Sequence, residues 1–357
     1  MTSGIIQEDF SMPGGVPNTP FQIHPSVINR LDPKYVDFFE ENLSDKPNLV
    51  YTHRVPLKAV KEGGNVIPGQ SSPREMSKVF EVDIKRKFTK GPSKIPARVF
   101  IPKRSNSNKE WPLLIWFHGG GWVLGGLDTE NSYCTTVADF CQMVVVTIDY
   151  RMAPQDPFPA CVEDAFESVI WAMEEAPKQL NVDNTKICIG GSSAGGNLTA
   201  VVTHKYASSP LSKKLPPLKF QLLVVPVTDN TATTDTNISW RQNEFTPQLP
   251  AEKMLWYRYL YLPRGQDDYK NPEASPIFYS DAITASVPPC YVAACELDIL
   301  RSEAEAYAEK LKKNGVATTI NIYPRVGHTA MVMNAVLDQG KDLVKDTIMA
   351  IKEAIAS

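Results

Sequence analysis

The sequence predicts an α/β fold in which a mostly parallel central sheet is flanked by helices and carries a helical cap. From about residue 78 onward, short apolar runs alternate with segments of helical length. Apolar runs without polar alternation are typical of strands covered on both faces, as in parallel sheets. Two segments, residues 1–77 and 228–274, depart from this alternation, and we expect them to lie outside the sheet.

Composition and charge indicate an ordinary enzyme surface. The 357 residues are 43% hydrophobic and 22% charged, with a net charge of −3 and no basic block, which argues against nucleic acid or an anionic membrane as partner. The first residues include Glu8 and Asp9 but no apolar stretch, and no apolar run is long enough to cross a bilayer. We expect a cytoplasmic protein without stable membrane insertion; the sequence leaves a homodimer open.

No motif in the chain indicates a metal or a nucleotide cofactor. CxxC and HExxH are absent, and neither glycine-rich loop matches GxGxxG or GxxxxGK[ST]. The cysteines are scattered among apolar neighbours, so we expect buried thiols rather than disulfides. They are Cys134, Cys141, Cys161, Cys188, Cys290 and Cys295.

The N-terminal segment, residues 1–77, is irregular and rich in Pro-Gly turns, with one or two short helices expected near 27–42. We interpret it as part of a cap. Residues 78–357 form the predicted catalytic domain. Its first predicted strand is residues 79–87, where apolar and polar residues alternate as in a half-buried antiparallel strand. Residues 97–101 can form the strand that pairs with it.

The buried strands and their helices follow in order. Continuous apolar runs predict strands at 113–117, 143–149, 186–190, 220–225, 290–294 and 318–323. Spaced apolar residues predict helices at 162–175, 194–206, 302–313 and 335–355.

Residues 228–274 interrupt the alternation of predicted strands and helices. This stretch is rich in aromatic residues and contains no strong strand. Its length favours a helical cap insertion, which we expect to join the N-terminal segment over the sheet; the alternative is an ordinary connection between elements.

A GxSxG pattern, Gly191 to Gly195, directly follows the predicted strand at 186–190 and opens the next helix. This strand–turn–helix context is typical of a nucleophile elbow and predicts Ser193 as the nucleophile. A serine at a helix start also points backbone N–H groups toward a developing oxyanion.

A serine hydroxyl needs a base, and His328 is the only histidine in a suitable place. His24 and His53 lie in the irregular N-terminal part, and His204 lies inside the helix after the elbow, away from its start. His118 belongs to a glycine motif. His328 follows the last predicted strand, where the hydrolase order of serine, acid and histidine requires the base.

The acid is expected at the end of the strand at 290–294. Asp298 is the preferred residue, and Glu296 in the same loop is the alternative. Asp281 and Glu303 lie outside that loop and are interpreted as surface or helix-capping charges.

A second glycine motif, His118-Gly119-Gly120-Gly121-Trp122, follows the strand at 113–117. Successive glycines let backbone N–H groups approach a ligand closely. Such an HGGG loop forms an oxyanion hole together with the N–H after the nucleophile.

Three segments together resemble the hormone-sensitive-lipase-like carboxylesterases of the α/β-hydrolase fold. They are HGGGW at 118–122, DYRMAP at 149–154 with FPA at 158–160, and GSSAGG at 191–196. The resemblance extends from about residue 79 to the C-terminus. In the second segment, we expect Arg151 to pair internally with Asp164.

The resemblance implies that Gly120, Gly121 and Ala194 donate the oxyanion-hole N–H groups, while Gly119 shapes the loop and His118 is structural. Ser193, Asp298 and His328 match the triad positions of the family, which also carries a cap over its active site.

Three positions depart from the family pattern. Ser192 replaces the usual Asp before the nucleophile, and residues 299–302 read ILRS where PLxD is frequent. Thr329 and its neighbours replace the common Gly-Phe after the base. These departures leave every catalytic group in place and are expected to change the shape of the pocket.

The predicted function is a serine carboxylesterase that acts on small esters with short to medium acyl chains in a hydrophobic pocket, without cofactor or metal. An amidase, a lactonase or an acyltransferase with the same triad is an alternative. A small-molecule receptor on the same scaffold is a second alternative, although the retained His328 argues against it.

Overall fold

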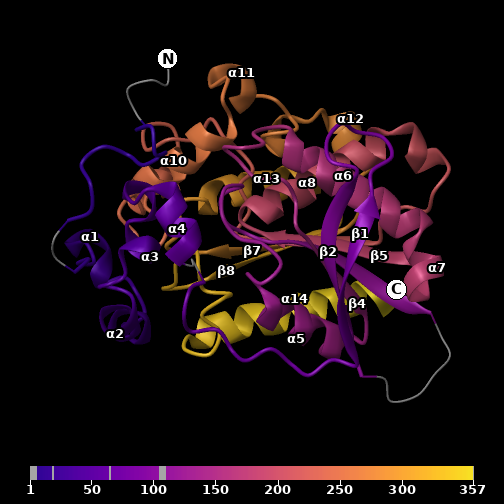
Figure 1. Ribbon diagram of the computed structural model, residues 1–357, viewed down its shortest axis with the longest axis horizontal. Coiled ribbons are helices and arrows are strands. Elements are labelled where there is room, and N and C mark those ends of the chain that lie inside the picture. The colour runs from indigo at the N-terminus through magenta and orange to yellow at the C-terminus, as the bar shows by residue number, and fades with distance from the viewer. Residues whose placement is uncertain (1–5, 18–19, 64–65, 104–109, 357) are drawn as a thin grey trace.

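An eight-stranded sheet forms the centre of the computed structural model, which describes residues 6–17, 20–63, 66–103 and 110–356 (Figure 1). The strand order is β1-β2-β4-β3-β5-β6-β7-β8. β1 and β2 pair antiparallel, as do β2 and β4, and the remaining neighbours are parallel. The strands are β1 (Lys78–Lys85), β2 (Lys94–Ile101), β3 (Trp111–Phe117), β4 (Val144–Ile148), β5 (Val182–Ser192), β6 (Phe220–Val224), β7 (Cys290–Cys295) and β8 (Thr318–Tyr323).

All eight predicted strands are confirmed. Every residue of β4, β6 and β7 is buried, which explains why these strands read as continuous apolar runs. In the parallel pair of β3 and β5, Phe117 lies opposite Gly191. The glycine motif starts directly after Phe117 and the GxSxG motif starts at Gly191, so the register places the two loops side by side.

Helices cover both faces of the sheet (Figure 1). α5 and α14 pack on one face, and α6, α8 and α13 on the other. The main helices are α5 (Asn131–Cys141), α6 (Ala160–Glu174), α8 (Ala194–Ser208), α13 (Arg301–Lys313) and α14 (Asp338–Ala356), with the shorter α7 (Ala176–Leu180), α12 (Asp281–Thr284), η2 (Pro210–Lys213) and η3 (Pro276–Phe278).

The predicted helices are confirmed, but α5 was not predicted. Its sequence is rich in Asn, Ser, Thr, Cys and aromatic residues, which have modest helix propensity. Tyr133, Val137 and Cys141 nevertheless bury one side of this helix against the sheet. Tertiary packing therefore stabilises a helix that local propensity does not favour.

The N-terminal segment and the insertion meet beside the sheet (Figure 1). Arg54 donates to Glu252 at 2.8 Å, and the Trp256 indole donates to the Phe10 carbonyl at 2.6 Å. Residues 1–5, 18–19 and 64–65 of the predicted cap segment lie outside the described residues. The elements of the two segments are α1 (Pro25–Ile28), α2 (Pro33–Asn42), α3 (Pro47–Val50), η1 (Thr52–Arg54), α4 (Leu57–Gly63), α9 (Ile238–Gln242), α10 (Ala251–Tyr261) and α11 (Gln266–Tyr269).

Two smaller predictions concern side chains in the core. The Arg151–Asp164 pair is confirmed, with Nε at 3.0 and 3.1 Å from the carboxylate oxygens, and the buried Arg86 binds the same carboxylate. All six cysteines are buried and free, as expected. Among the described helices, none has the length and apolar character needed to span a membrane.

Candidate active site

Ser193 occupies the sharp turn between β5 and α8. Its backbone has φ 53° and ψ −115°, in the left-handed half of conformational space that a non-glycine residue rarely adopts. A hydrogen bond of 2.8 Å from the Ser193 N–H to the Val224 carbonyl holds this turn against the neighbouring strand. Such local strain is typical of functional turns, and here it places the hydroxyl at the carboxyl edge of the sheet.

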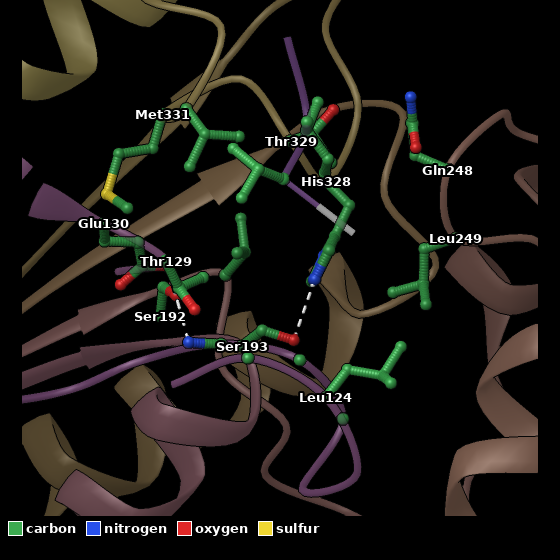
Figure 2. A pocket seen from close by; sticks show the side chains of 18 of the residues that line it. Leu124, Thr129, Glu130, Ser192, Ser193, Gln248, Leu249, His328, Thr329 and Met331 are labelled. Carbon is green, nitrogen blue, oxygen red and sulfur yellow. Dashed lines mark hydrogen bonds between the residues drawn. The ribbon is translucent and has the colours of Figure 1, made fainter. Parts of the chain in front are cut away.

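Ser193, His328 and Asp298 form a hydrogen-bonded chain. The Ser193 Oγ lies 2.8 Å from His328 Nε2 (Figure 2). His328 Nδ1 in turn lies 2.7 Å from Asp298 Oδ2. Because the Ser193 hydroxyl donates to His328 Nε2, the proton of the neutral ring is on Nδ1. Nδ1–H then donates to the Asp298 carboxylate. This is the arrangement in which a histidine accepts a proton from serine while a carboxylate orients the ring.

The other acids considered from the sequence have different partners. Glu296 accepts a hydrogen bond of 2.7 Å from the Arg325 N–H, and Asp281 is an exposed residue in the first turn of α12. The interpretation of Glu303 as a surface or capping charge is wrong. Glu303 is 2% exposed and accepts from the Thr228 N–H and the Trp240 indole, because the first turn of α13 packs beneath the insertion. Burial raises the pKa of Glu303 to about 8.

The remaining histidines also have other partners. His118 is fully buried, stacks on Tyr150 and lies 2.7 Å from the Gly119 carbonyl. Burial lowers the pKa of His118 to about 4, and lowers that of His204 to about 4 as well. His53 contacts Glu252, and His24 stacks on Phe245.

The glycine loop lies beside Ser193, and two of its residues require glycine. Gly120 has φ 122° and Gly121 has φ 63°. A Cβ at Gly120 would strike the Leu124 carbonyl, and one at Gly121 would strike the Tyr257 ring. Within the described part of the chain, the N–H groups of Gly120 and Gly121 have no protein acceptor. Ala194, the first residue of α8, has the kind of N–H that a helix start leaves free.

Glu130 is a residue of this site that the sequence analysis missed. It is 5% exposed and lies beneath the glycine loop. Its carboxylate accepts hydrogen bonds from Ser192 Oγ at 2.5 Å, from Trp116 Nε1 at 2.5 Å and from the Gly119 N–H at 3.4 Å. Burial raises its pKa. Glu130 thus ties the glycine loop to Ser192, the residue before Ser193.

The sequence held one signal that could have pointed to Glu130: Ser192 stands where the resembled family has an Asp. Here Ser192 donates to Glu130. A carboxylate is therefore still present beneath the loop, but it comes from a residue 62 positions earlier in the chain.

Replacing Glu130 by Gln is expected to lower kcat on p-nitrophenyl acetate by about 10- to 100-fold, with little change in KM. The amide has one acceptor oxygen where the carboxylate has two, so at least one of three buried donors loses its acceptor. A displacement of the loop by about 1 Å is enough for a loss of about 10². Steady-state kinetics of the purified variant measure this.

The matched control moves the carboxylate back to the family position. Ser192→Asp alone sets two buried carboxylates against each other and is expected to lose activity. The double variant Glu130→Gln/Ser192→Asp again has one carboxylate and should recover up to about tenfold in kcat over Glu130→Gln, so that a loss of about 10² would be reduced to about tenfold. A Glu130→Gln enzyme with wild-type kcat would contradict the positioning role.

A cavity of about 130 Å³ opens at Ser193 between the sheet and the two added segments. Asn48, Leu49 and Thr52 come from the N-terminal segment, and Gln248, Leu249, Lys253 and Tyr257 from the insertion. Of the aromatic residues in the insertion, only Tyr257 lines the cavity; Trp240, Trp256 and Tyr261 are buried in the core. Most aromatic side chains of the insertion therefore pack away from the cavity, and its wall combines apolar side chains such as Leu49 and Leu249 with the polar Gln248 and Lys253. Among the described residues, no group of three His, Cys, Asp or Glu side chains could hold a metal ion.

Comparisons with known proteins point to one family. The sequence model of a family described as "alpha/beta hydrolase fold" matches residues 114–332. An AB hydrolase superfamily protein of Schizosaccharomyces pombe is 48% identical over 331 residues, which cover 93% of this chain and 96% of that protein. Carboxylesterase NlhH of Mycobacterium tuberculosis is 31% identical over 268 residues, 74% of this chain and 80% of that protein.

Solved structures give the same result. An esterase of Pyrobaculum calidifontis superimposes with a TM-score of 0.77 at 28% identity, covering 92% of this chain and all of that one. EstE1, a thermophilic carboxylesterase from a metagenomic library, superimposes with a TM-score of 0.72 at 29% identity, covering 80% of this chain and 91% of that one.

Proposed function

The chain belongs to the α/β-hydrolase family and is an ester-acting hydrolase, and we propose that it cleaves small carboxylic esters with short to medium acyl chains through Ser193. The observation that carries this proposal is the hydrogen-bonded chain of Ser193, His328 and Asp298 beside free N–H groups of the glycine loop.

In the first half of the reaction, Ser193 Oγ attacks the ester carbonyl carbon while His328 Nε2 takes the hydroxyl proton. The carbonyl oxygen becomes an oxyanion, which the N–H groups of Gly120, Gly121 and Ala194 stabilise. The bond to the alkoxy oxygen then breaks, and His328 gives its proton to that oxygen, so the alcohol leaves and an acyl-enzyme remains.

In the second half, water loses a proton to His328 and attacks the acyl carbon. The same N–H groups stabilise the second oxyanion. The bond between the carbon and Ser193 Oγ breaks, the proton returns from His328 to Ser193, and the carboxylic acid leaves. Asp298 holds the ring in one tautomer and stabilises its charged form throughout.

The cap is part of this proposal. Residues 1–77 and 228–274 would cover a catalytic domain formed by the rest of residues 78–357. The hydrogen bonds that join the two segments support it, as does the contribution of Leu49 and Leu249 to one cavity with Ser193. A cap that excludes water strengthens every electrostatic interaction in the site.

Labelling with a fluorophosphonate tests the proposal directly. The intact enzyme is expected to gain one adduct, mapped by peptide mass spectrometry to Ser193, and to hydrolyse p-nitrophenyl acetate and butyrate until it is labelled. A panel of matched esters, lactones and amides then assigns the substrate class. An adduct on another residue, or turnover that persists after full labelling, would refute the role of Ser193.

A further inference from the structure

Lys253, near the start of α10, lies in the cavity wall and has no acidic partner among the described residues. It is 6% exposed, and its Nζ donates to the Leu49 carbonyl at 3.1 Å. The adjacent acid, Glu252, binds His53 and Arg54 instead. An ammonium group has three donors. Within the described residues the Leu49 carbonyl is its one acceptor, so two N–H groups are available to a ligand.

An unpaired buried ammonium is costly, because it has lost water without gaining a counter-charge. The burial lowers the pKa of Lys253 to about 7, and no carboxylate opposes this shift. An apolar residue of similar length would fill the same space without that cost. The amine is therefore best explained by an anionic group that enters the cavity.

Gln248 offers a second donor in the same wall. It is 5% exposed, and its Nε2 has no hydrogen-bond partner in the described structure. Its backbone φ of 72° lies in the left-handed region. Figure 2 shows Gln248 and Leu249 on the side of the cavity away from Glu130 and Met331. A buried amide without an acceptor also indicates a ligand that supplies one.

We propose that Lys253 and Gln248 bind a carboxylate of the substrate, so that the enzyme prefers esters bearing a carboxylate a short aliphatic chain away from the scissile bond. Leu249, Met331 and Val332 line the same cavity and suit the methylene groups between the two ends. The inference rests on the proposed function of Ser193, and it adds the substrate class.

Two matched substrate pairs test this preference in the wild-type enzyme. Monoethyl glutarate is compared with ethyl 5-methylhexanoate, and 4-acetoxybutanoate with 4-methylpentyl acetate, so that only the terminal carboxylate differs from an isopropyl group. The first pair carries the charge on the acyl side and the second on the alcohol side. In one pair the charged ester is expected to have a kcat/KM about 10- to 100-fold higher. Preference for the neutral member in both pairs would overturn the proposal.

Variants then assign the preference to these side chains. Lys253→Met keeps the length of the stem and removes the amine, and should lower the charged-to-neutral ratio of kcat/KM by about tenfold or more; Gln248→Leu should lower it by about threefold. The control is Lys310→Met, since the Lys310 amine likewise donates to backbone carbonyls but lies outside the cavity. Its ratio should equal that of the wild type. An unchanged ratio in Lys253→Met would overturn the assignment.

Fluorophosphonate labelling separates this inference from the function on which it rests. If Ser193 is labelled and neutral esters are cleaved, but neither charged ester is preferred, only the carboxylate site is wrong. If the wild-type enzyme is not labelled at Ser193, the proposed function itself fails.

Discussion

Replacing Ser193 by alanine is expected to lower kcat on p-nitrophenyl acetate by about 10⁶-fold. The variant keeps the glycine loop and the cavity but has no atom that can form the acyl-enzyme. His328 Nε2, which lies 2.8 Å from the serine oxygen, also loses the hydroxyl that it deprotonates. The residual rate should come from oxyanion stabilisation and binding alone, about 10³- to 10⁴-fold above the rate in water.

The measurement is a steady-state assay of the purified variant, with a urea unfolding curve to show that the fold is intact. Ser208→Ala is the matched control, because Ser208 ends α8, the helix that Ser193 precedes, and caps only helix carbonyls. It should retain wild-type kcat. Turnover of the Ser193→Ala enzyme close to that of the wild type would exclude Ser193 as the nucleophile.

Replacing Asp298 by asparagine is expected to lower kcat by about 10⁴-fold. Asp298 is 1% exposed, and its two oxygens have different partners: Oδ1 accepts from the Leu300 N–H at 3.0 Å, and Oδ2 from His328. In the variant the amide oxygen should stay on the Leu300 N–H, so the NH₂ group faces His328 Nδ1. The ring proton then moves to Nε2, which can no longer accept the proton of Ser193.

The comparison with Glu296→Gln makes this prediction specific to one acid. Glu296 lies in the same loop, but it accepts from the Arg325 N–H and does not contact the histidine. The Glu296→Gln variant replaces one charge-assisted hydrogen bond by a neutral one, and its kcat should therefore fall by less than about tenfold. If Glu296→Gln lost as much activity as Asp298→Asn, or if Asp298→Asn kept wild-type kcat, the assignment of Asp298 would be wrong.

Much of the fold was predictable because most of its strands and helices leave a local pattern in the sequence. A strand buried on both faces must be apolar throughout, so the parallel strands appear as continuous runs. α5 was the main omission, since its stability comes from packing rather than from propensity. The elbow could be predicted because a sharp turn between a strand and a helix requires small residues on either side of Ser193.

The sequence by itself determined the sheet, the nucleophile elbow, the glycine loop and the choice of His328 as candidate base, because each depends on short-range pattern and chain order. Only the tertiary structure decided which acid meets His328, that Glu130 reaches Ser192, and that Lys253 and Gln248 face the cavity of Ser193. Glu130 and Ser192 are 62 residues apart, and Lys253 and Leu49 are 204 apart. The direction of such side chains is fixed by packing between distant segments, which no local pattern records.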